Sequence, residues 1–242
     1  MAAEVVFKDD FSRPGALPAS ATTSLDSTGP QVGGPYTGAG TVFDVKQAQG
    51  TAASAGAALG GKNFAQAPSA ETAAEAIRGT RWYLDEVGQA AVKDSRVLIS
   101  FDFYMVGGDG SKNMNLISFQ DAGTGGRGFD IALKDDGTVS WHDGIAHPVT
   151  GLFPTNMAAR FELMVNFAGG YFEAKIGDLR FSGNLAADAH DDFFYDPSEA
   201  NHAGQEWFSN LLFYNTTGLE FFYNNAEIVV LPGSDTGRRV AK

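Results

Sequence analysis

The stretch RVLISFDFYMVGGDGSKNMNLISFQDAGTGGRGFDIALKDDGTVSWHDG, residues 96–144, decides the fold class. It contains four strand-like segments separated by turn residues. In the first segment, every second residue from Val97 to Met105 is apolar, and polar residues such as Asp102 stand between them. A period of two is typical of a β-strand with one face in a core. The stretch therefore predicts an all-β fold.

The turn between the third and fourth segments predicts their register. A three-residue loop at 135–137 places the apolar residues of both segments on one face, whereas a two-residue loop does not. Gly137 then takes the left-handed position of a type I turn followed by a G1 bulge. This register sets Asp130 opposite His142 on the polar face.

A second run, residues 161–181, predicts a three-stranded meander because its apolar residues again alternate. Glycine-containing pairs at 169–170 and 177–178 are suited to two-residue turns. The first of these turns would pair Val165 with Ala174.

The remaining segments fit one domain over residues 1–242, a size that single β-sandwiches commonly reach. Residues 16–61 are rich in Ala, Gly, Ser and Thr, which indicates surface connections with edge strands. Ser69–Ile77 is the one helical candidate, and it would be short. We expect a long acidic loop at 186–206 and a loose tail at 232–242.

Composition excludes several classes of protein. Apolar residues make up 43% of the chain and include 19 Phe, which is enough for a packed core. The net charge of −12 disfavours binding to nucleic acids and anionic lipids. The sequence contains no run of about 18 apolar residues, so no segment is expected to insert into a membrane. There is no cysteine, and no glycine-rich phosphate loop leads from a strand into a helix, so no organic cofactor is expected.

The first residues, Met1-Ala2-Ala3-Glu4, show no signal peptide. They are typical either of an intracellular start or of a mature secreted chain that carries an initiator methionine. We expect an extracellular or periplasmic location.

Four segments carry a resemblance to a known family: VVFKDDFSRP, RVLISFDFYM, GFDIALKDDGTVSWHDG and FSNLLFYNTTGLEFFYNNAEIVV. They resemble laminin-G-like jelly rolls of the concanavalin A-like lectin/glucanase superfamily, in its secreted bacterial form. The resemblance implies two stacked antiparallel sheets, adjacent first and last strands, and a ligand groove on the concave sheet. The chain departs from the family at 224–226, where Asn-Asn-Ala replaces the common Asp-Asn-Val.

The resemblance also implies a structural Ca²⁺ where the first and last strands meet, held by oxygen ligands. The candidate ligands are the side chains of Asp9, Asp10, Asn224 and Asn225. The alternative is a turn capped by Asp and Asn hydrogen bonds without a metal ion.

The polar face of the sheet is the predicted ligand surface, because sugar recognition combines hydrogen-bonding groups with aromatic rings. Its candidate residues are Asp102, Tyr104, Asn115, Asp130, His142 and Lys175. The alternative is an ordinary sheet surface that faces solvent.

An enzyme stays open as a second function class. A polysaccharide lyase needs a carboxylate neutraliser, a base and an acid. The candidate residues of these types are His142, Tyr104, Arg127, Gln120 and Asp130. However, the strand motifs of jelly-roll alginate lyases and of the superfamily's glucanases are absent.

We therefore rank a non-catalytic extracellular module that binds glycan or a cell-surface protein first. A polysaccharide lyase or glycoside hydrolase acting on the concave sheet comes second. A self-assembling structural surface protein comes third, and the oligomeric state stays open.

Overall fold

The computed structural model describes residues 3–11, 22–24, 30–33, 37–40, 44–46, 57–60, 64–66, 78–83, 95–119, 127–142, 145–166, 171–184, 210–215 and 218–231. The predicted helix at Ser69–Ile77, the acidic loop at 186–206 and the tail at 232–242 lie outside these residues, as does most of the stretch 16–61.

The strands, in chain order, are β1 (Glu4–Asp9), β2 (Thr22–Ser24), β3 (Thr37–Gly40), β4 (Asp44–Lys46), β5 (Phe64–Gln66), β6 (Arg78–Tyr83), β7 (Arg96–Met105), β8 (Asn113–Phe119), β9 (Arg127–Lys134), β10 (Val139–His142), β11 (Ala146–Pro148), β12 (Ala158–Asn166), β13 (Tyr171–Ile176), β14 (Leu179–Asn184), β15 (Asn210–Asn215) and β16 (Phe221–Leu231). Residues 57 and 58 are helical and lead into a turn. Within the described ranges, no helix is long and apolar enough to cross a membrane.

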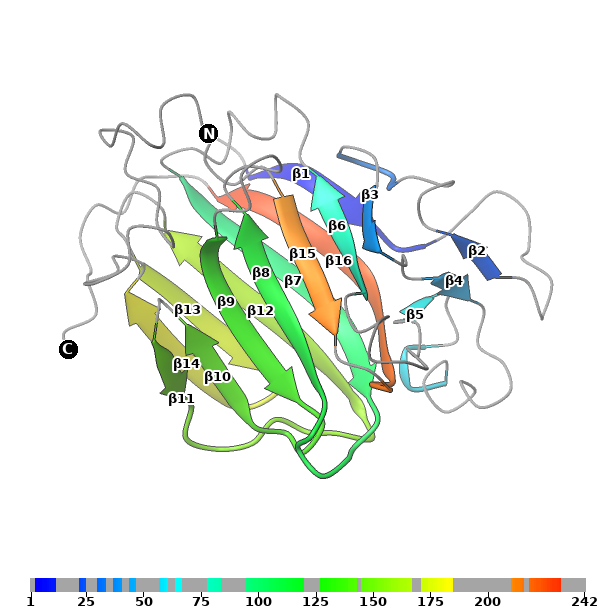
Figure 1. Cartoon of the computed structure of the whole chain (residues 1–242). Coiled ribbons are helices and arrows are strands. Elements are labelled where there is room, and N and C mark those ends of the chain that lie inside the picture. Colours follow the sequence, from blue (N-terminus) through cyan, green and yellow to red (C-terminus); the bar gives the residue numbers. More distant parts are fainter. Residues whose placement is uncertain are drawn as a thin grey trace.

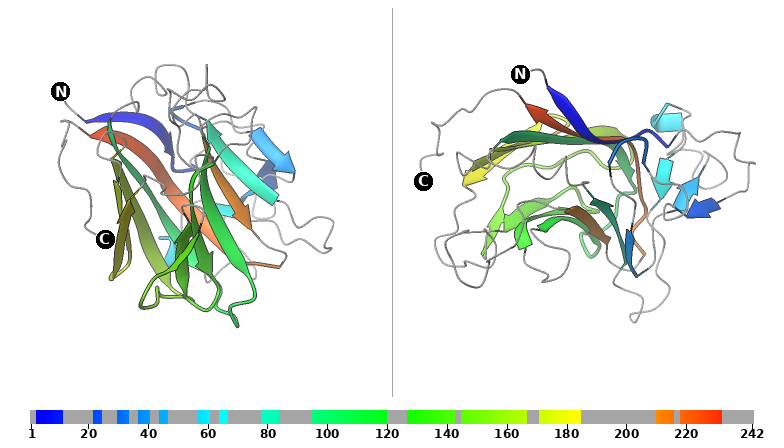
Figure 2. Two further views of the ribbon diagram at one scale, coloured as in Figure 1. Left: turned by 60° about the vertical axis from the view of Figure 1, so that its left-hand side comes forward. Right: turned by 90° about the horizontal axis from the view of Figure 1, so that it is seen from above.

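Two antiparallel sheets stack face to face (Figures 1 and 2). The nine-stranded sheet has the order β14-β13-β12-β7-β16-β5-β4-β2, and β1 also pairs with β16. The seven-stranded sheet has the order β11-β10-β9-β8-β15-β6-β3. The predicted all-β, two-sheet antiparallel sandwich is confirmed. The pairing of β1 with β16 brings the first and last strands together, as the resemblance implied.

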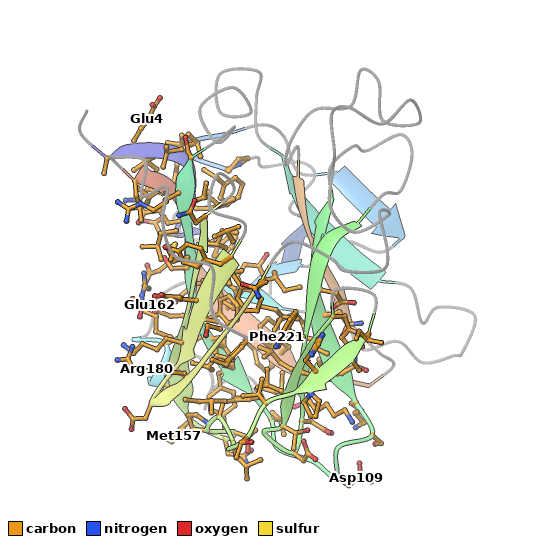
Figure 3. The ribbon with its side chains drawn as sticks, turned by 90° about the vertical axis from the view of Figure 1, so that its left-hand side faces the viewer. Glu4, Asp109, Met157, Glu162, Arg180 and Phe221 are labelled. Carbon is orange, nitrogen blue, oxygen red and sulfur yellow. The ribbon has the colours of Figure 1, made fainter. Side chains whose placement is uncertain are left out.

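The core lies between the two sheets, where Phe221 is visible in Figure 3. The predicted alternation of β7 is confirmed, since its apolar residues from Val97 to Met105 are buried. Phe101 stacks on Phe161 of β12 with ring centroids 4.8 Å apart. Each such side chain contributes about 1.5–3 kcal/mol by leaving water. Burial of this one face fixes which β7 residues point outward.

The register predicted for β9 and β10 is confirmed. Leu133 pairs with Val139, and His142 pairs with Asp130. Gly137 has a φ of 87° and donates a hydrogen bond to the Lys134 carbonyl at 3.0 Å. A side chain would be strained at this backbone conformation, so glycine suits the position.

One predicted register is wrong. Val165 pairs with Phe172 and not with Ala174, and Asn166 pairs with Tyr171. The connection between β12 and β13 therefore spans four residues, 167–170. A slip of two residues keeps every side chain on its own face, so the apolar pattern fits both registers equally well. The turn predicted at 177–178 is confirmed, with Ile176 paired to Leu179.

The four strand-like segments of 96–144 do not share one sheet. β7 belongs to the nine-stranded sheet, whereas β8, β9 and β10 belong to the seven-stranded sheet. The polar residues of these strands therefore lie on two outer faces, one on each side of the sandwich. The prediction that these polar residues share a single face is wrong.

Candidate functional site

A polar cleft lies on the outer face of the nine-stranded sheet, where β1 runs beside β16. Its volume is about 290 Å³. It is lined by Lys8, Asp9, Asp10, Arg160, Asn225, Ala226 and Glu227. The lining comes from both ends of the sequence and from β12, so only the folded sandwich assembles it.

A bulge in β16 shapes the floor of the polar cleft. Asn224 pairs with Asp102 and Glu227 pairs with Ser100, so two residues of β16 stand opposite one residue of β7. Asn225, at the bulge, has a φ of 48°, a conformation that asparagine tolerates better than most residues. Its side-chain Nδ2 donates to Asp102 Oδ2 at 2.6 Å. The bulge thus places an amide group directly above the Asp102 carboxylate.

Arg160 is held in a fixed orientation beside this amide. Its Nη1 donates to Asp102 Oδ1 at 2.8 Å, and its Nη2 donates to Ser100 Oγ at 2.8 Å. Its Nε lies 3.6 Å from Glu162 Oε1. The side chain is still 41% exposed. A guanidinium has five N–H donors, so these contacts leave donors for a ligand.

Further charged pairs extend across the same outer face. Lys175 Nζ lies 3.2 Å from Glu162 Oε2, and Lys8 Nζ lies 3.6 Å from Glu227 Oε1. Figure 3 shows Glu162 and Arg180 projecting away from the sandwich on this side. Exposed pairs of this kind contribute only about 0–1 kcal/mol each to stability. Their effect here is to alternate donors and acceptors along the surface.

The structure divides the predicted ligand residues between the two outer faces. Asp102 and Lys175 belong to the charged pairs on the outer face of the nine-stranded sheet, beside the polar cleft. Asn115, Asp130 and His142 lie on the other side of the sandwich, because their neighbours along β8, β9 and β10 point into the core.

Tyr104 lies on the same outer face as Asp102, but it is covered. It packs with Leu59 and Phe222 in a small apolar cluster separate from the main core. Its ring is therefore not an open stacking surface in this structure.

The structure does not bring the candidate catalytic residues of the lyase alternative into one site. Tyr104 and His142 point outward from different sheets, so the whole sandwich separates them. A lyase needs its base and its acid at one substrate, so these two residues do not form one lyase site. Gln120 and the side chain of Arg127 lie outside the described residues.

The predicted metal ligands lie at the junction of β1 and β16, and the carboxylates of the two aspartates accept hydrogen bonds. Asp9 Oδ1 accepts from the Phe11 amide at 2.7 Å. The Asp10 carboxylate accepts from the Gln31 side chain, and Asn225 donates to Asp102. Within the described ranges, no three His, Cys, Asp or Glu side chains cluster as metal ligands do.

Two cations, Lys8 and Arg160, line the same cleft as these carboxylates. Ca²⁺ takes six to eight oxygen ligands, and nearby positive charge opposes its binding. These two cations oppose a bound cation electrostatically, and the calcium site stays a prediction beside the alternative of turns capped by Asp and Asn side chains.

Sequence reasoning missed Lys8 and Glu227 of the cleft lining, and it also missed Arg160 and Leu59. Arg160 stands one position before a core phenylalanine, so the alternation of β12 could have placed it on the polar face. Leu59 covers Tyr104 from a distant segment, and no sequence signal indicates that contact.

The fold is shared with known structures, although the sequence is not. No protein-family model and no curated protein matches the chain. A carbohydrate esterase of the Shiga toxin-encoding bacteriophage phi24B is similar in structure, with 12% identity, a TM-score of 0.55, and coverage of 96% of this chain and all of that one. The binding domain of botulinum neurotoxin serotype D is similar over 94% of this chain, with 9% identity and a TM-score of 0.54.

A sialidase shows the same fold over 96% of this chain, with 9% identity and a TM-score of 0.52. The chain spans 48% of the neurotoxin domain and 19% of the sialidase. Similarity at these identities shows a common β-sandwich architecture.

Proposed function

We propose that this chain is a non-catalytic, extracellular β-sandwich module that binds glycan in the polar cleft between β1, β16 and β12. The observation that carries the proposal is Arg160, a partly exposed guanidinium fixed by Asp102 and Ser100 at the cleft wall.

The chemistry of the cleft suits sugar hydroxyls, which both donate and accept hydrogen bonds. Arg160 and Lys8 supply donors, and the carboxylates of Asp10 and Glu227 supply acceptors. Because the two signs of charge alternate, the cleft favours neutral sugars over strongly anionic polymers. Its volume of about 290 Å³ lies near the lower end of ligand sites and suits one sugar ring.

The structural neighbours support this function class. Botulinum neurotoxin type C enters cells through interaction with two ganglioside molecules, and the DC binding domain has been seen in complex with SialylT. The DC binding domain also forms a complex with synaptotagmin II. A glycan on a cell surface is therefore the partner that we propose.

The test is binding to a printed array of neutral and acidic oligosaccharides, followed by calorimetric titration of the strongest hits. The variant Arg160→Met removes the fixed guanidinium and keeps the length of the side chain. Arg180→Met is the matched control, because Arg180 lies on the same outer face but outside the cleft. We expect Arg160→Met to weaken binding by about tenfold or more, a loss of about 1.4 kcal/mol.

The control should bind as the wild type does, and both variants should keep the wild-type melting temperature. A wild-type protein that binds no glycan on the array contradicts the proposal. Equal losses in the two arginine variants would contradict the assignment to this cleft. Release of unsaturated or reducing ends from any bound glycan would contradict the absence of catalysis.

A further inference from the structure

An aromatic pair lies on the outer face of the nine-stranded sheet, where solvent would be expected. Tyr104 of β7 and Phe222 of β16 are cross-strand partners, with ring centroids 6.3 Å apart and planes tilted by 55°. Their exposures are only 8% and 3%. They form a cluster separate from the main core between the two sheets.

The cover over this pair is a short turn at residues 57–60. Leu59 places its side chain on the two rings and is itself 6% exposed. The turn closes through a hydrogen bond from the Gly60 amide to the Ala57 carbonyl at 3.1 Å. Gly60 has a φ of 80°, which favours glycine. Leu59 is thus the buried apolar side chain that packs with the two rings, and the partly buried Val106 packs against the same cluster.

Asn224 holds the turn in place, but only one of the two polar atoms of its side-chain amide has a hydrogen-bond partner among the described residues. Its Nδ2 donates to the Leu59 carbonyl at 3.1 Å. Its Oδ1 is buried and has no hydrogen-bond partner among the described residues. A buried acceptor without a donor is costly and uncommon, and a bound water or a ligand hydroxyl group can supply the missing donor.

The covered pair is continuous with the polar cleft. Tyr104 lies two residues from Asp102 along β7, and Phe222 lies two residues from Asn224 along β16. Asn224 and Asp102 are cross-strand partners. Two strand residues span about 7 Å, roughly the length of one sugar ring. The aromatic rings and the cleft therefore stand next to each other in a single row.

We propose that Tyr104, Phe222 and Asn224 form a second sugar subsite, which Leu59 fills in the free protein. This inference rests on the proposed function of the adjacent cleft. A sugar ring entering the subsite displaces Leu59 and stacks its apolar face on the aromatic pair. One of its hydroxyl groups donates to Asn224 Oδ1. Occupancy of both subsites requires at least two linked sugars.

The first experiment measures the cover itself. Nitration of Tyr104 by tetranitromethane, followed by peptide mass spectrometry, reports the accessibility of this ring in the full chain. We expect Leu59→Ala to increase nitration of Tyr104, and Leu59→Met, which retains the cover, to leave it at the wild-type level. Unchanged nitration in Leu59→Ala would show that Leu59 is not the cover and would overturn the proposal.

The second experiment measures binding on the printed glycan array. Leu59→Ala should bind glycans of two or more sugars about tenfold more strongly than the wild type does, while its binding to single sugars stays unchanged; the gain corresponds to about 1.4 kcal/mol. Adding Phe222→Leu should abolish the gain. A purely structural cluster would show no such dependence on glycan length.

The outcomes separate this inference from the proposed function. If Tyr104 becomes accessible but the array signal of Leu59→Ala matches the wild type, the subsite is wrong and the Arg160 cleft stands. If neither protein binds any glycan, both proposals fail. If Leu59→Ala does not fold, hydrogen exchange of the wild type decides: bound oligosaccharide should accelerate exchange at the Gly60 amide, and an unchanged rate overturns the subsite.

Discussion

His142 faces Asp130 directly across the β9–β10 pair, on the outer side of the seven-stranded sheet. Arg160 lies on the outer side of the other sheet, so the core separates the two positions. We therefore expect His142→Ala to change glycan binding by less than about twofold and stability by no more than about 1 kcal/mol. Calorimetric titration and denaturant unfolding check both values. A large loss of binding in this variant would place the ligand on the seven-stranded sheet.

The Asp102–Arg160 pair should matter more for binding than for stability. Its partners are 29% and 41% exposed at their side chains, and such pairs are worth about 0–1 kcal/mol. A double-mutant cycle with Asp102→Asn and Arg160→Met should therefore give a coupling free energy of unfolding below about 1 kcal/mol. The same cycle measured on glycan binding should give a larger coupling. Equal couplings would mean that the pair serves only the fold.

Gly183 of β14 cannot accept a side chain. A Cβ atom at this position would stand 2.6 Å from Trp141 and 2.7 Å from Phe172, both of which belong to packed rings. We expect Gly183→Ala to lower the free energy of unfolding by about 1–3 kcal/mol. Ser182→Ala, an exposed position on the same strand, should stay within about 0.5 kcal/mol. Similar effects in both variants would show that the rings move aside.

The turn at Asp136 should contribute to acid sensitivity. Thr138 donates to Asp136 Oδ1 from its hydroxyl at 2.7 Å and from its amide at 2.9 Å, and these bonds lower the pKa of Asp136. A carboxyl group whose pKa is lower in the folded state stabilises the protein above its unfolded pKa of about 4, and this contribution is lost as the pH falls through the folded value.

Thr138→Val removes the hydroxyl donor and keeps the side-chain shape. The stability difference from the wild type should be present at pH 6 and should shrink as the pH falls below about 4. In an Asp136→Asn background the same substitution should give a difference that does not depend on pH. Denaturant unfolding across this range measures both, and a constant gap in the wild-type background would contradict the assignment.

Calcium binding can be tested independently of glycan binding. Because Asp10 accepts a hydrogen bond from Gln31 and two cations line the cleft, we expect the melting temperature to be the same in EDTA and in millimolar CaCl₂. A bound structural ion would instead raise the melting temperature with increasing calcium concentration. Such a rise, abolished by Asp9→Asn, would restore the calcium site implied by the family resemblance.

The alternation of apolar residues was sufficient to predict the faces of strands, and turn chemistry was sufficient for one register. The loop before Val139 could be predicted because a wrong length would turn Leu133 or its partner outward. The β12–β13 register could not be predicted, because a slip of two residues at Val165 leaves every side chain on the same face of the sheet. Alternation also carries no information on which sheet a strand joins, so Asp102 and His142 were placed on one face.

The candidate site was less predictable because it depends on contacts between distant segments. Asp102 and Lys175 were found by their polar positions in strands. The burial of Tyr104 depends on Leu59, which lies in a segment of low complexity and meets the sheet only in the folded chain. The fixed orientation of Arg160 depends on its cross-strand partners in β7. These partners are known only once the register of β12 and β7 is known.

The pairing of β1 with β16 sets Glu4 opposite Val230. The first and last described strands thus begin and end side by side, so we expect the sandwich to tolerate insertion into a surface loop of another protein. By the same geometry, a short linker between these ends, with new termini opened at Gly177–Asp178, should yield a circular permutant that folds. Display of the polar cleft on an unrelated scaffold requires no change to the strands that build it.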